Sequence, residues 1–242
     1  MLLFGTGAVN QSYAVPPLVA GDVPTAEKGH VELYVGTRYQ KTGSIEMQLP
    51  STEIVYGISS KQEVTFEIPY LLMAGQDGFG DGVLGTKYLF LPETDKRPGI
   101  AGSFEAKLDN GSRSRGLGTG AIDYDLRVRA QKSWGWFTGI FNLGYTFIGE
   151  PKVSGVRQEK NNVFFSAFVQ EYALNAKTRL LSEVYWETGE EPGAPDRLAA
   201  DVGFKHSLLP NLSVHGAVGK SLREGNRGGP KLRIYAGMKL EF

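Results

Sequence analysis

The last residues of the chain alternate strictly between two kinds of side chain. Counting back from Phe242 to Leu232, every second residue is apolar, and the residues between them are charged, small or amphipathic. Because successive side chains of a β-strand point to opposite faces, one face of this strand meets an apolar medium and the other meets water or charge. The same alternation recurs from Val31 onward without a helical repeat. This repetition, ending in an aromatic residue, is typical of an outer-membrane β-barrel.

The composition restricts the classes of protein to which the chain can belong. Its 242 residues suffice for one large β domain. Lys plus Arg and Asp plus Glu each number 26, so no basic excess indicates a nucleic-acid partner. The absence of cysteine excludes disulfides, thiolate metal sites and a cysteine nucleophile. No apolar run approaches the ~18 residues of a transmembrane helix, but a membrane-spanning strand needs only every second residue to be apolar.

The first residues are predicted to lie outside the barrel wall. Residues 1–14 contain an apolar stretch and a small-x-small site, which resemble the end of a secretory signal and equally fit a disordered tail. Residues 15–29 contain three prolines and are too irregular for a strand. Because this segment precedes the first strand on the periplasmic side, we expect it to stay in the periplasm or to enter and narrow the lumen. The barrel itself is predicted over residues 30–242.

About twelve strands are predicted where the alternation persists between clusters of Gly, Pro, Asn, Asp and Ser. Most have the ~9–11 residues that a tilted strand needs to cross a bilayer. The predicted strands span residues 30–40, 51–59, 61–70, 80–91, 99–109, 120–132, 136–149, 162–174, 178–187, 197–208, 211–221 and 231–242. The predicted fold is therefore all-β, a transmembrane antiparallel up-and-down β-barrel of about twelve strands.

The connections between these strands are predicted to alternate in length. Tight turns are expected at residues 59–62, 133–135, 174–177 and 209–211. Longer loops are expected at residues 41–50, 71–79, 110–119, 150–161, 188–196 and 222–230, and the connection 92–98 is intermediate. Outer-membrane barrels have short periplasmic turns and longer external loops. An even number of strands would also place both termini in the periplasm.

The two faces of each predicted strand differ in charge. Leu126 and Val128, for example, alternate with Arg127 and Arg129. A lysine or arginine facing lipid near the bilayer midplane would cost roughly 2–4 kcal/mol, so the charged faces are predicted to point into the lumen. The strand over residues 162–174 is apolar on both faces, and its facing stays open.

The charged faces supply the candidate functional residues. One reading is a polar pathway whose charges filter solutes, and the other is a set of structural ion pairs that stiffen a narrow barrel. The near balance of acids and bases predicts weak ion selectivity. The lumen-lining candidates are Glu63, Glu67, Lys87, Glu105, Lys107, Asp123, Asp125, Arg127, Arg129, Arg179, Glu183, Arg197, Asp201, Lys205, Arg233 and Lys239.

Four segments, in their order and spacing, resemble a known family. They are GFGDGVLGTKYLFLPE (residues 78–93), GLGTGAIDYDLRV (116–128), FNLGYTFIGE (141–150) and EVYWET (183–188). The chain is similar, from about Pro17 to Phe242, to the outer-membrane channels described as "MetA-pathway of phenol degradation". The resemblance implies a monomeric barrel of twelve strands that passes small, often hydrophobic or aromatic, molecules across the outer membrane. It names no catalytic residues.

The sequence thus predicts a passive outer-membrane channel of a Gram-negative bacterium, without a cofactor, metal site or enzymatic activity. An outer-membrane barrel enzyme such as a lipid hydrolase is the alternative. Ser213 and His215 share an inward face, but no nucleophile-elbow or zinc spacing surrounds them. A structural barrel without transport is a further alternative. The expected partners are membrane lipids and lipopolysaccharide, the barrel-assembly machinery through the C-terminal strand, and a small-molecule solute, with the protein acting as a monomer.

Overall fold

A computed structural model describes residues 16–42, 45–73, 75–153, 155–223 and 229–242. One sheet contains thirteen strands of this described part, and a separate two-stranded hairpin, formed by β9 (Lys152–Val153) and β10 (Val156–Arg157), lies apart from it. The sheet strands are β1 (Val31–Lys41), β2 (Ile45–Ser59), β3 (Gln62–Met73), β4 (Gln76–Phe79), β5 (Val83–Leu91), β6 (Gly99–Lys107), β7 (Asp123–Trp134), β8 (Phe137–Phe147), β11 (Val163–Ala173), β12 (Thr178–Glu187), β13 (Arg197–Leu209), β14 (Leu212–Ser221) and β15 (Leu232–Glu241).

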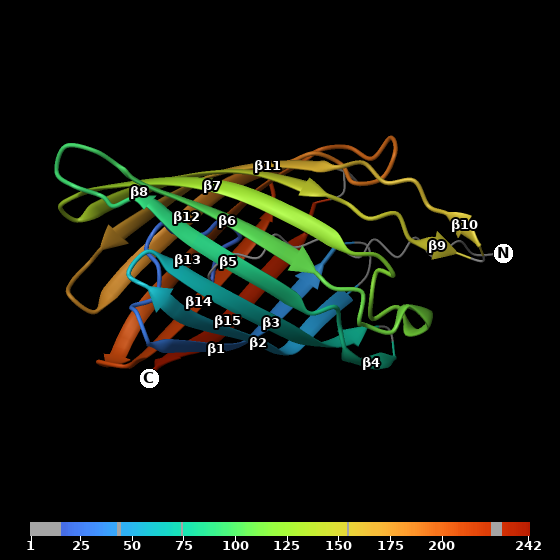
Figure 1. Ribbon diagram of the computed structural model, residues 1–242, viewed down its shortest axis with the longest axis horizontal. Helices are drawn as coiled ribbons and strands as arrows, with labels where there is room; N and C mark the ends of the chain where they lie inside the picture. Colours follow the sequence, from blue (N-terminus) through green and yellow to red (C-terminus); the bar gives the residue numbers. More distant parts are fainter. Residues whose placement is uncertain (1–15, 43–44, 74, 154, 224–228) are drawn as a thin grey trace.

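The sheet closes on itself to form a barrel (Figure 1). Every neighbouring pair in the ring is antiparallel, and β1 pairs with β2 on one side and with β15 on the other. Among the described pairings, β4 pairs with β3 alone, so the other twelve strands make the ring. Closure leaves no unpaired edge within the ring, which is the condition that a sheet must meet in hydrocarbon. The predicted up-and-down barrel of twelve strands is confirmed.

The register sets which side chains face outward. In β7, Tyr124, Leu126 and Val128 are exposed on the outside, and Asp125 and Arg127 between them are buried. The same division holds in β3, β12, β13 and β15. Side chains on the outer face are apolar and lie where lipid would contact them, which matches the outward-facing band of a membrane barrel.

The facing of β11, which the sequence leaves open, is settled by burial. Val163, Phe165 and Val169 are buried toward the inside, whereas Phe164 and Phe168 are exposed on the outside. This stretch of the inner wall is therefore apolar. The sequence of β11 is apolar on both faces because one face contacts lipid and the other contacts a part of the lumen that is shielded from water.

Two of the predicted loops are wrong. Residues 41–50 were expected to form a loop, but β2 begins at Ile45 and runs through Pro50. The register shifts between Gln48 and Ser51, so a bulge accommodates the proline, which has no N–H to donate to the ladder. Both Gln48 and Ser51 stay buried on the inner face across the bulge. The first connection on the long-loop side is consequently short.

The second wrong loop is the expected one at residues 71–79. Strand β3 continues to Met73, and β4 pairs back onto it from Gln76. Gly75 has a φ of 84°, a conformation that glycine adopts readily, at the tip of this hairpin. The strands therefore extend past the barrel rim on this side.

The remaining connections sort to two ends as expected. The hairpins at residues 60–61, 135–136, 174–177 and 210–211 lie at one end with the C-terminus, and the longer loops, including β4 and the β9–β10 hairpin, lie at the other end (Figure 1). In outer-membrane barrels the short turns face the periplasm, so we call these the periplasmic and external ends. Within the described residues, no helix is long and apolar enough to cross a membrane.

Candidate functional site in the barrel lumen

The candidate site is the inner surface of the barrel. Most of the predicted lumen residues are buried there, because alternate residues of each strand point inward and the lumen is narrow. The buried ones are Glu63, Glu67, Lys87, Glu105, Lys107, Asp123, Asp125, Arg127, Arg129, Glu183, Asp201 and Arg233. The other four, Arg179, Arg197, Lys205 and Lys239, are more exposed and lie near the ends of their strands.

One part of the inner wall, formed by β2, β3, β5, β6 and β7, carries most of these charges. Arg127 Nε lies 2.8 Å from Asp125 Oδ1, and Lys107 Nζ lies 2.5 Å from Asp123 Oδ2. Thr146 of the next strand donates a hydrogen bond to Asp125. We call this part the charged wall. Breaking a buried pair of this kind by removing one partner leaves an uncompensated charge, which is strongly destabilising.

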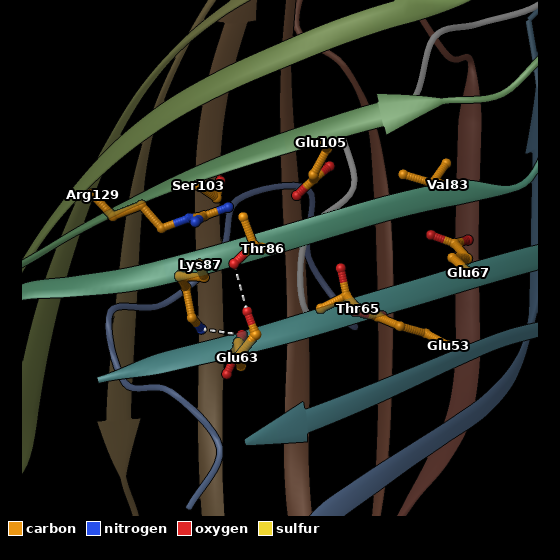
Figure 2. Close-up of a pocket in the computed structure, with 10 residues that line it drawn as sticks. All are labelled: Glu53, Glu63, Thr65, Glu67, Val83, Thr86, Lys87, Ser103, Glu105 and Arg129. Atoms are coloured by element: carbon orange, nitrogen blue, oxygen red, sulfur yellow. Dashed lines mark hydrogen bonds and ion pairs between the residues drawn. The ribbon is translucent and has the colours of Figure 1, made fainter. Parts of the chain in front are cut away.

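A pocket in the charged wall is lined by four glutamates, Glu53, Glu63, Glu67 and Glu105 (Figure 2). Lys87 and Arg129 face the same space, and Lys87 Nζ lies 3.0 Å from Glu63 Oε1. Glu105 Oε2 and Arg129 Nη1 have no hydrogen-bond partner among the described residues. The pocket thus presents both acceptors and donors, in keeping with a polar lining rather than with a charge-specific filter.

The opposite part of the inner wall carries a buried apolar cluster, whose side chains come from β8, β11, β12, β13 and β14. The same strands also place polar groups inward, among them Asn142, Glu183 and Asp201. We call this part the apolar wall; its members are Ile140, Phe165, Ala167, Val169, Leu181, Tyr185, Ala199 and Ala217. The cluster also contains Leu18 and Ala20, which precede the first strand. The apolar wall is therefore covered by another segment of the same chain.

That covering segment, residues 16–28, lies inside the barrel; we call it the lumen segment. Its backbone N–H groups donate to inward side chains of the wall. Val19 N and Ala20 N donate to the two carboxylate oxygens of Glu183 at 2.6 and 2.9 Å. Gly21 N donates to Asn142 Oδ1 at 3.2 Å, and the Asn142 amide donates back to Gly21 O at 3.0 Å. The wall side chains thus accept the backbone hydrogen bonds that a neighbouring strand would accept in a sheet.

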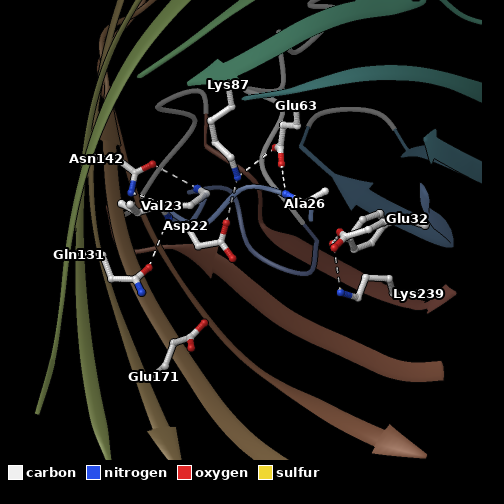
Figure 3. Close-up of polar contacts among 12 residues, drawn as sticks. Asp22, Val23, Ala26, Glu32, Glu63, Lys87, Gln131, Asn142, Glu171 and Lys239 are labelled. Atoms are coloured by element: carbon white, nitrogen blue, oxygen red, sulfur yellow. Dashed lines mark hydrogen bonds and ion pairs between the residues drawn. The ribbon is translucent and has the colours of Figure 1, made fainter. Parts of the chain in front are cut away.

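The second half of the lumen segment binds the charged wall (Figure 3). Val23 N donates to Gln131 Oε1 at 3.3 Å, and Ala26 N donates to Glu63 Oε2 at 2.6 Å. Asp22 Oδ1 lies 3.4 Å from Lys87 Nζ. Lys87 therefore joins Asp22 of the lumen segment to Glu63 of the wall.

Asp22 is the ionisable group of the lumen segment at this contact. Burial by itself raises the pKa of the Asp22 carboxyl, but the positive charges of Lys87, Lys205 and Arg129 outweigh burial and hold the pKa below its usual value. Asp22 is consequently charged at neutral pH and contributes an ionic contact between the lumen segment and the charged wall.

A buried three-residue cluster lies beside the apolar wall. The guanidinium of Arg233 contacts Asp201, and its Nη2 lies 3.5 Å from Glu183 Oε1. The same Nη2 donates to Pro17 O at 3.3 Å. Glu183 is only 2% exposed. The Glu183 carboxyl is thus contacted by Arg233 on one side and by backbone N–H groups of the lumen segment on the other.

The four more exposed candidates form pairs at the two ends of the barrel. At the periplasmic end, Arg179 and Lys205 lie 3.3 and 3.5 Å from the carboxylate of Glu171, and Lys239 lies 3.4 Å from Glu32. At the external end, Arg197 lies 3.0 Å from Glu187. The periplasmic residues border a cavity of about 220 Å³ that also touches Asp22, Tyr34 and His215.

Several inward residues were absent from the sequence-based candidates. Asn142 and Gln131 bind the lumen segment, and Tyr34 and Tyr185 line the lumen. The candidates were chosen by charge, which overlooks neutral polar and aromatic groups. Strict alternation along β8 places Asn142 inward, so this residue was within reach of the same pattern.

Ser213 and His215, which share an inward face in the sequence pattern, are not in contact through a hydrogen bond in the described part of the chain. The His215 ring is instead stacked on Tyr34 and lies 3.3 Å from the Tyr235 hydroxyl. Likewise, in the described part of the chain no group of three or more acidic or histidine side chains is placed to hold a metal ion.

Comparisons with known proteins agree with this architecture. The family model described as "MetA-pathway of phenol degradation" matches residues 23–232. An outer membrane channel from Pseudomonas putida has a similar structure, with a TM-score of 0.77 and 14% sequence identity over 93% of this chain and 100% of that one. The KdgM porin is similar at a TM-score of 0.58 and 10% identity, over 86% of this chain and 99% of that one. A search of curated protein sequences finds no match.

Proposed function

The chain belongs to the family described as "MetA-pathway of phenol degradation", and we propose that it is an outer-membrane channel for passive uptake of small hydrophobic or aromatic molecules. The proposed location is the outer membrane of a Gram-negative bacterium. Closure of the ring in β-strands supports it, because a closed barrel is one of the two architectures that satisfy their backbone groups in a bilayer.

The observation that carries the proposal is the lumen segment. A barrel that served only as a membrane anchor would need no separate segment in its lumen, since its own side chains fill a narrow lumen. Here residues 16–27, which pair with no strand in the described part of the chain, lie in the lumen and are held by side-chain acceptors of the wall, including Glu183, Asn142 and Glu63. Displacement of this segment would open a path between the charged and apolar walls.

The solute class is proposed from the apolar wall. A pathway for small sugars or ions would be polar on every side, whereas here one side carries a buried apolar cluster that includes Ile140, Phe165 and Leu181. The balance of acids and bases on the charged wall favours neutral solutes over ions of one sign.

Uptake into liposomes tests the function. Purified protein reconstituted into liposomes should admit a neutral aromatic such as benzyl alcohol faster than a sugar of similar mass, with protein-free liposomes giving the background permeation. Because small aromatics cross lipid unaided, the comparison is made as the increment due to protein. An equal increment for both solutes would contradict the proposed preference, and no increment for either would contradict the channel.

A further inference from the structure

The periplasmic mouth of the barrel carries an unbalanced group of basic side chains. The cavity of about 220 Å³ at this end is lined by residues of the two turns at 174–177 and 210–211 and by the strands beside them. Lys177, Arg179 and Lys205 all line it, from the turn before β12, from β12 and from β13. We call these three residues the basic cluster.

Two members of the basic cluster are held together by the register of the sheet. Arg179 lies directly opposite Lys205, and like charges in this relation are destabilising. The two cations share one carboxylate, because Arg179 Nη1 and Lys205 Nζ lie 3.3 and 3.5 Å from the oxygens of Glu171. These distances exceed the ~2.7–2.9 Å of a short charge-assisted hydrogen bond. Lys177 forms no ion pair with any described residue.

Three positive charges and one carboxylate partner leave a local excess of two at the basic cluster. The two carboxylates that line the cavity are contacted by other lysines, Asp22 by Lys87 and Glu241 by Lys239. Lys239 also contacts a second acid, Glu32. The other side of the mouth thus offsets the excess, so the positive charge is a local feature and does not make the pore as a whole ion-selective.

The basic cluster also has more donors than its acid can accept. Arginine has five N–H donors and lysine three, and neither side chain accepts a hydrogen bond. Arg179 and Lys205 each donate one hydrogen bond to Glu171. The cavity volume is several times the ~30 Å³ that one water molecule occupies in the liquid, so a small ion fits beside the cluster. The ligand that suits these groups is negatively charged and has several acceptor oxygens.

We propose that the basic cluster is a binding site for a small dianion whose charge is carried by carboxylate or phosphate oxygens, and that this ion competes with Asp22 of the lumen segment for Lys205. Two negative charges match the local excess, and a carboxylate or phosphate accepts two parallel hydrogen bonds from an arginine. Asp22 lines the same cavity, and Lys205 is one of the charges that hold its pKa down. The proposal goes beyond the uptake of neutral solutes and does not depend on it.

Equilibrium dialysis of radiolabelled succinate against the full chain in phosphatidylcholine nanodiscs tests the site. Butyrate has the same four-carbon chain with one carboxylate. At constant ionic strength, butyrate should displace succinate only at a concentration about tenfold higher, the factor expected for one charge-assisted hydrogen bond. Displacement at equal concentrations would overturn the assignment to a dianion, and the absence of saturable succinate binding would overturn the site.

Variants with opposite expected effects identify the residues. Lys205→Met should weaken succinate binding about tenfold. Lys132→Met is the matched control and should leave binding unchanged, since Lys132 lies near the same end, pairs with Glu93 and does not line the cavity. Glu171→Gln should tighten binding, because the acid that competes for Arg179 and Lys205 loses its charge. A damaged fold would not tighten binding. Equal weakening in Lys205→Met and Lys132→Met, or weaker binding in Glu171→Gln, would overturn the proposal.

The Asp22→Asn variant tests the competition with the lumen segment. Without the Asp22 charge, succinate meets less repulsion, and Lys205 is no longer shared. Succinate binding should tighten about threefold, as expected for charges that interact across a hydrated space. By reciprocity, bound succinate weakens the hold on the seated segment by the same factor. An unchanged affinity in Asp22→Asn would overturn the competition.

Dialysis in phosphatidylglycerol nanodiscs separates a free ion from a lipid headgroup. An unchanged succinate affinity would support a free ion, whereas loss of succinate binding would show that an anionic headgroup occupies the cluster and would overturn the assignment to a free dianion. Dialysis requires no conduction, so the proposed channel function fails separately. A barrel that binds succinate but admits no solute overturns the channel and leaves the site.

Discussion

The charged wall and the apolar wall line the same lumen, but their inward side chains are stabilised in different ways. On the charged wall, most groups find partners within the wall, such as Arg127 with Asp125 and Lys107 with Asp123. The side chains of the apolar wall cannot satisfy one another in this way. Exposing them to water is unfavourable, and this cost is removed only when another apolar surface covers them. Leu18, Val19 and Ala20 supply that cover.

The difference shows how one short segment can fit a lumen of mixed character. Its first part is apolar and meets the apolar wall, and its second part carries Asp22 and meets Lys87 of the charged wall. Both parts are bound in the same way, because carboxylate and amide oxygens of the wall accept hydrogen bonds from their backbone N–H groups. The side chains of the segment therefore match the polarity of the wall, while its backbone hydrogen bonds keep the segment in place.

The largest expected effect is on the free energy of unfolding, and it comes from substituting one buried residue in each wall. Arg127→Met leaves Asp125 buried without its partner and should destabilise the barrel by roughly 3–5 kcal/mol. Phe165→Ala should cost a similar amount, about 3–5 kcal/mol, by leaving a cavity beneath the lumen segment. Denaturant unfolding in detergent measures both changes.

Two control variants replace the same residue types at exposed positions, so they show how much of each loss of stability is due to burial. Arg179→Met removes an arginine that is half exposed at the periplasmic end and should cost at most about 1 kcal/mol. Phe168→Ala removes a phenylalanine from the lipid-facing side of the same strand as Phe165. If Arg179→Met destabilised the barrel as much as Arg127→Met, the distinction between buried and rim charges would be wrong.

A second prediction concerns the point where the lumen segment joins the barrel. A Cβ atom on Gly57 would lie 2.0 Å from the backbone oxygen of Glu27, so Gly57→Ala should push the end of the segment away from β2. We expect faster proteolysis of the segment and a higher conductance. Gly139→Ala is the control, because its Cβ would meet only ordinary contacts at 3.6 Å. An unchanged segment in Gly57→Ala would show that this anchor is dispensable.

A third prediction weakens the hold from the apolar side. Glu183→Gln retains the size of the side chain, but its amide has one acceptor oxygen for the two N–H groups of Val19 and Ala20. One of the two donors loses its partner, which should cost about 1–3 kcal/mol. The fraction of time that single channels spend in the open state should rise. Glu187→Gln should leave that fraction unchanged, and an equal rise in both variants would contradict the role of Glu183.

The smallest expected effect concerns pH on the charged side. The pKa of Asp22 is held below its usual value, so its contact with Lys87 stabilises the seated segment above the ordinary aspartate pKa of about 4. That contribution is lost as the pH falls through the depressed pKa. Channel opening should therefore increase under acidic conditions, and Asp22→Asn should remove this component while raising opening at neutral pH. An identical acid response in Asp22→Asn would assign it to other groups.

Alternation predicted most of the barrel because it reports a local property, the two-residue period of a strand. It placed Arg127 and Glu183 inward and Leu126 outward. It failed at β2, where the bulge at Pro50 interrupts the period while the strand continues. It left β11 open because Phe165 faces a covered lumen, which has the same polarity as lipid.

The hold on the lumen segment was beyond the reach of the sequence. Residues 16–28 have no period of their own, and the contact between Val19 and Glu183 joins positions 164 residues apart. The wall groups that bind the segment are ordinary inward residues of their strands, and nothing in their spacing marks Asn142 or Glu63 as acceptors for a backbone. Such contacts are fixed by the closure of the ring.

The most direct test of the central claim, that the lumen segment closes the channel, is the single-channel conductance of the protein with and without residues 15–28 in planar bilayers. We predict small or rare conductance for the full chain, a clear increase on deletion, and a cation-to-anion permeability ratio near one in both. Equal conductance with and without the segment would contradict this claim.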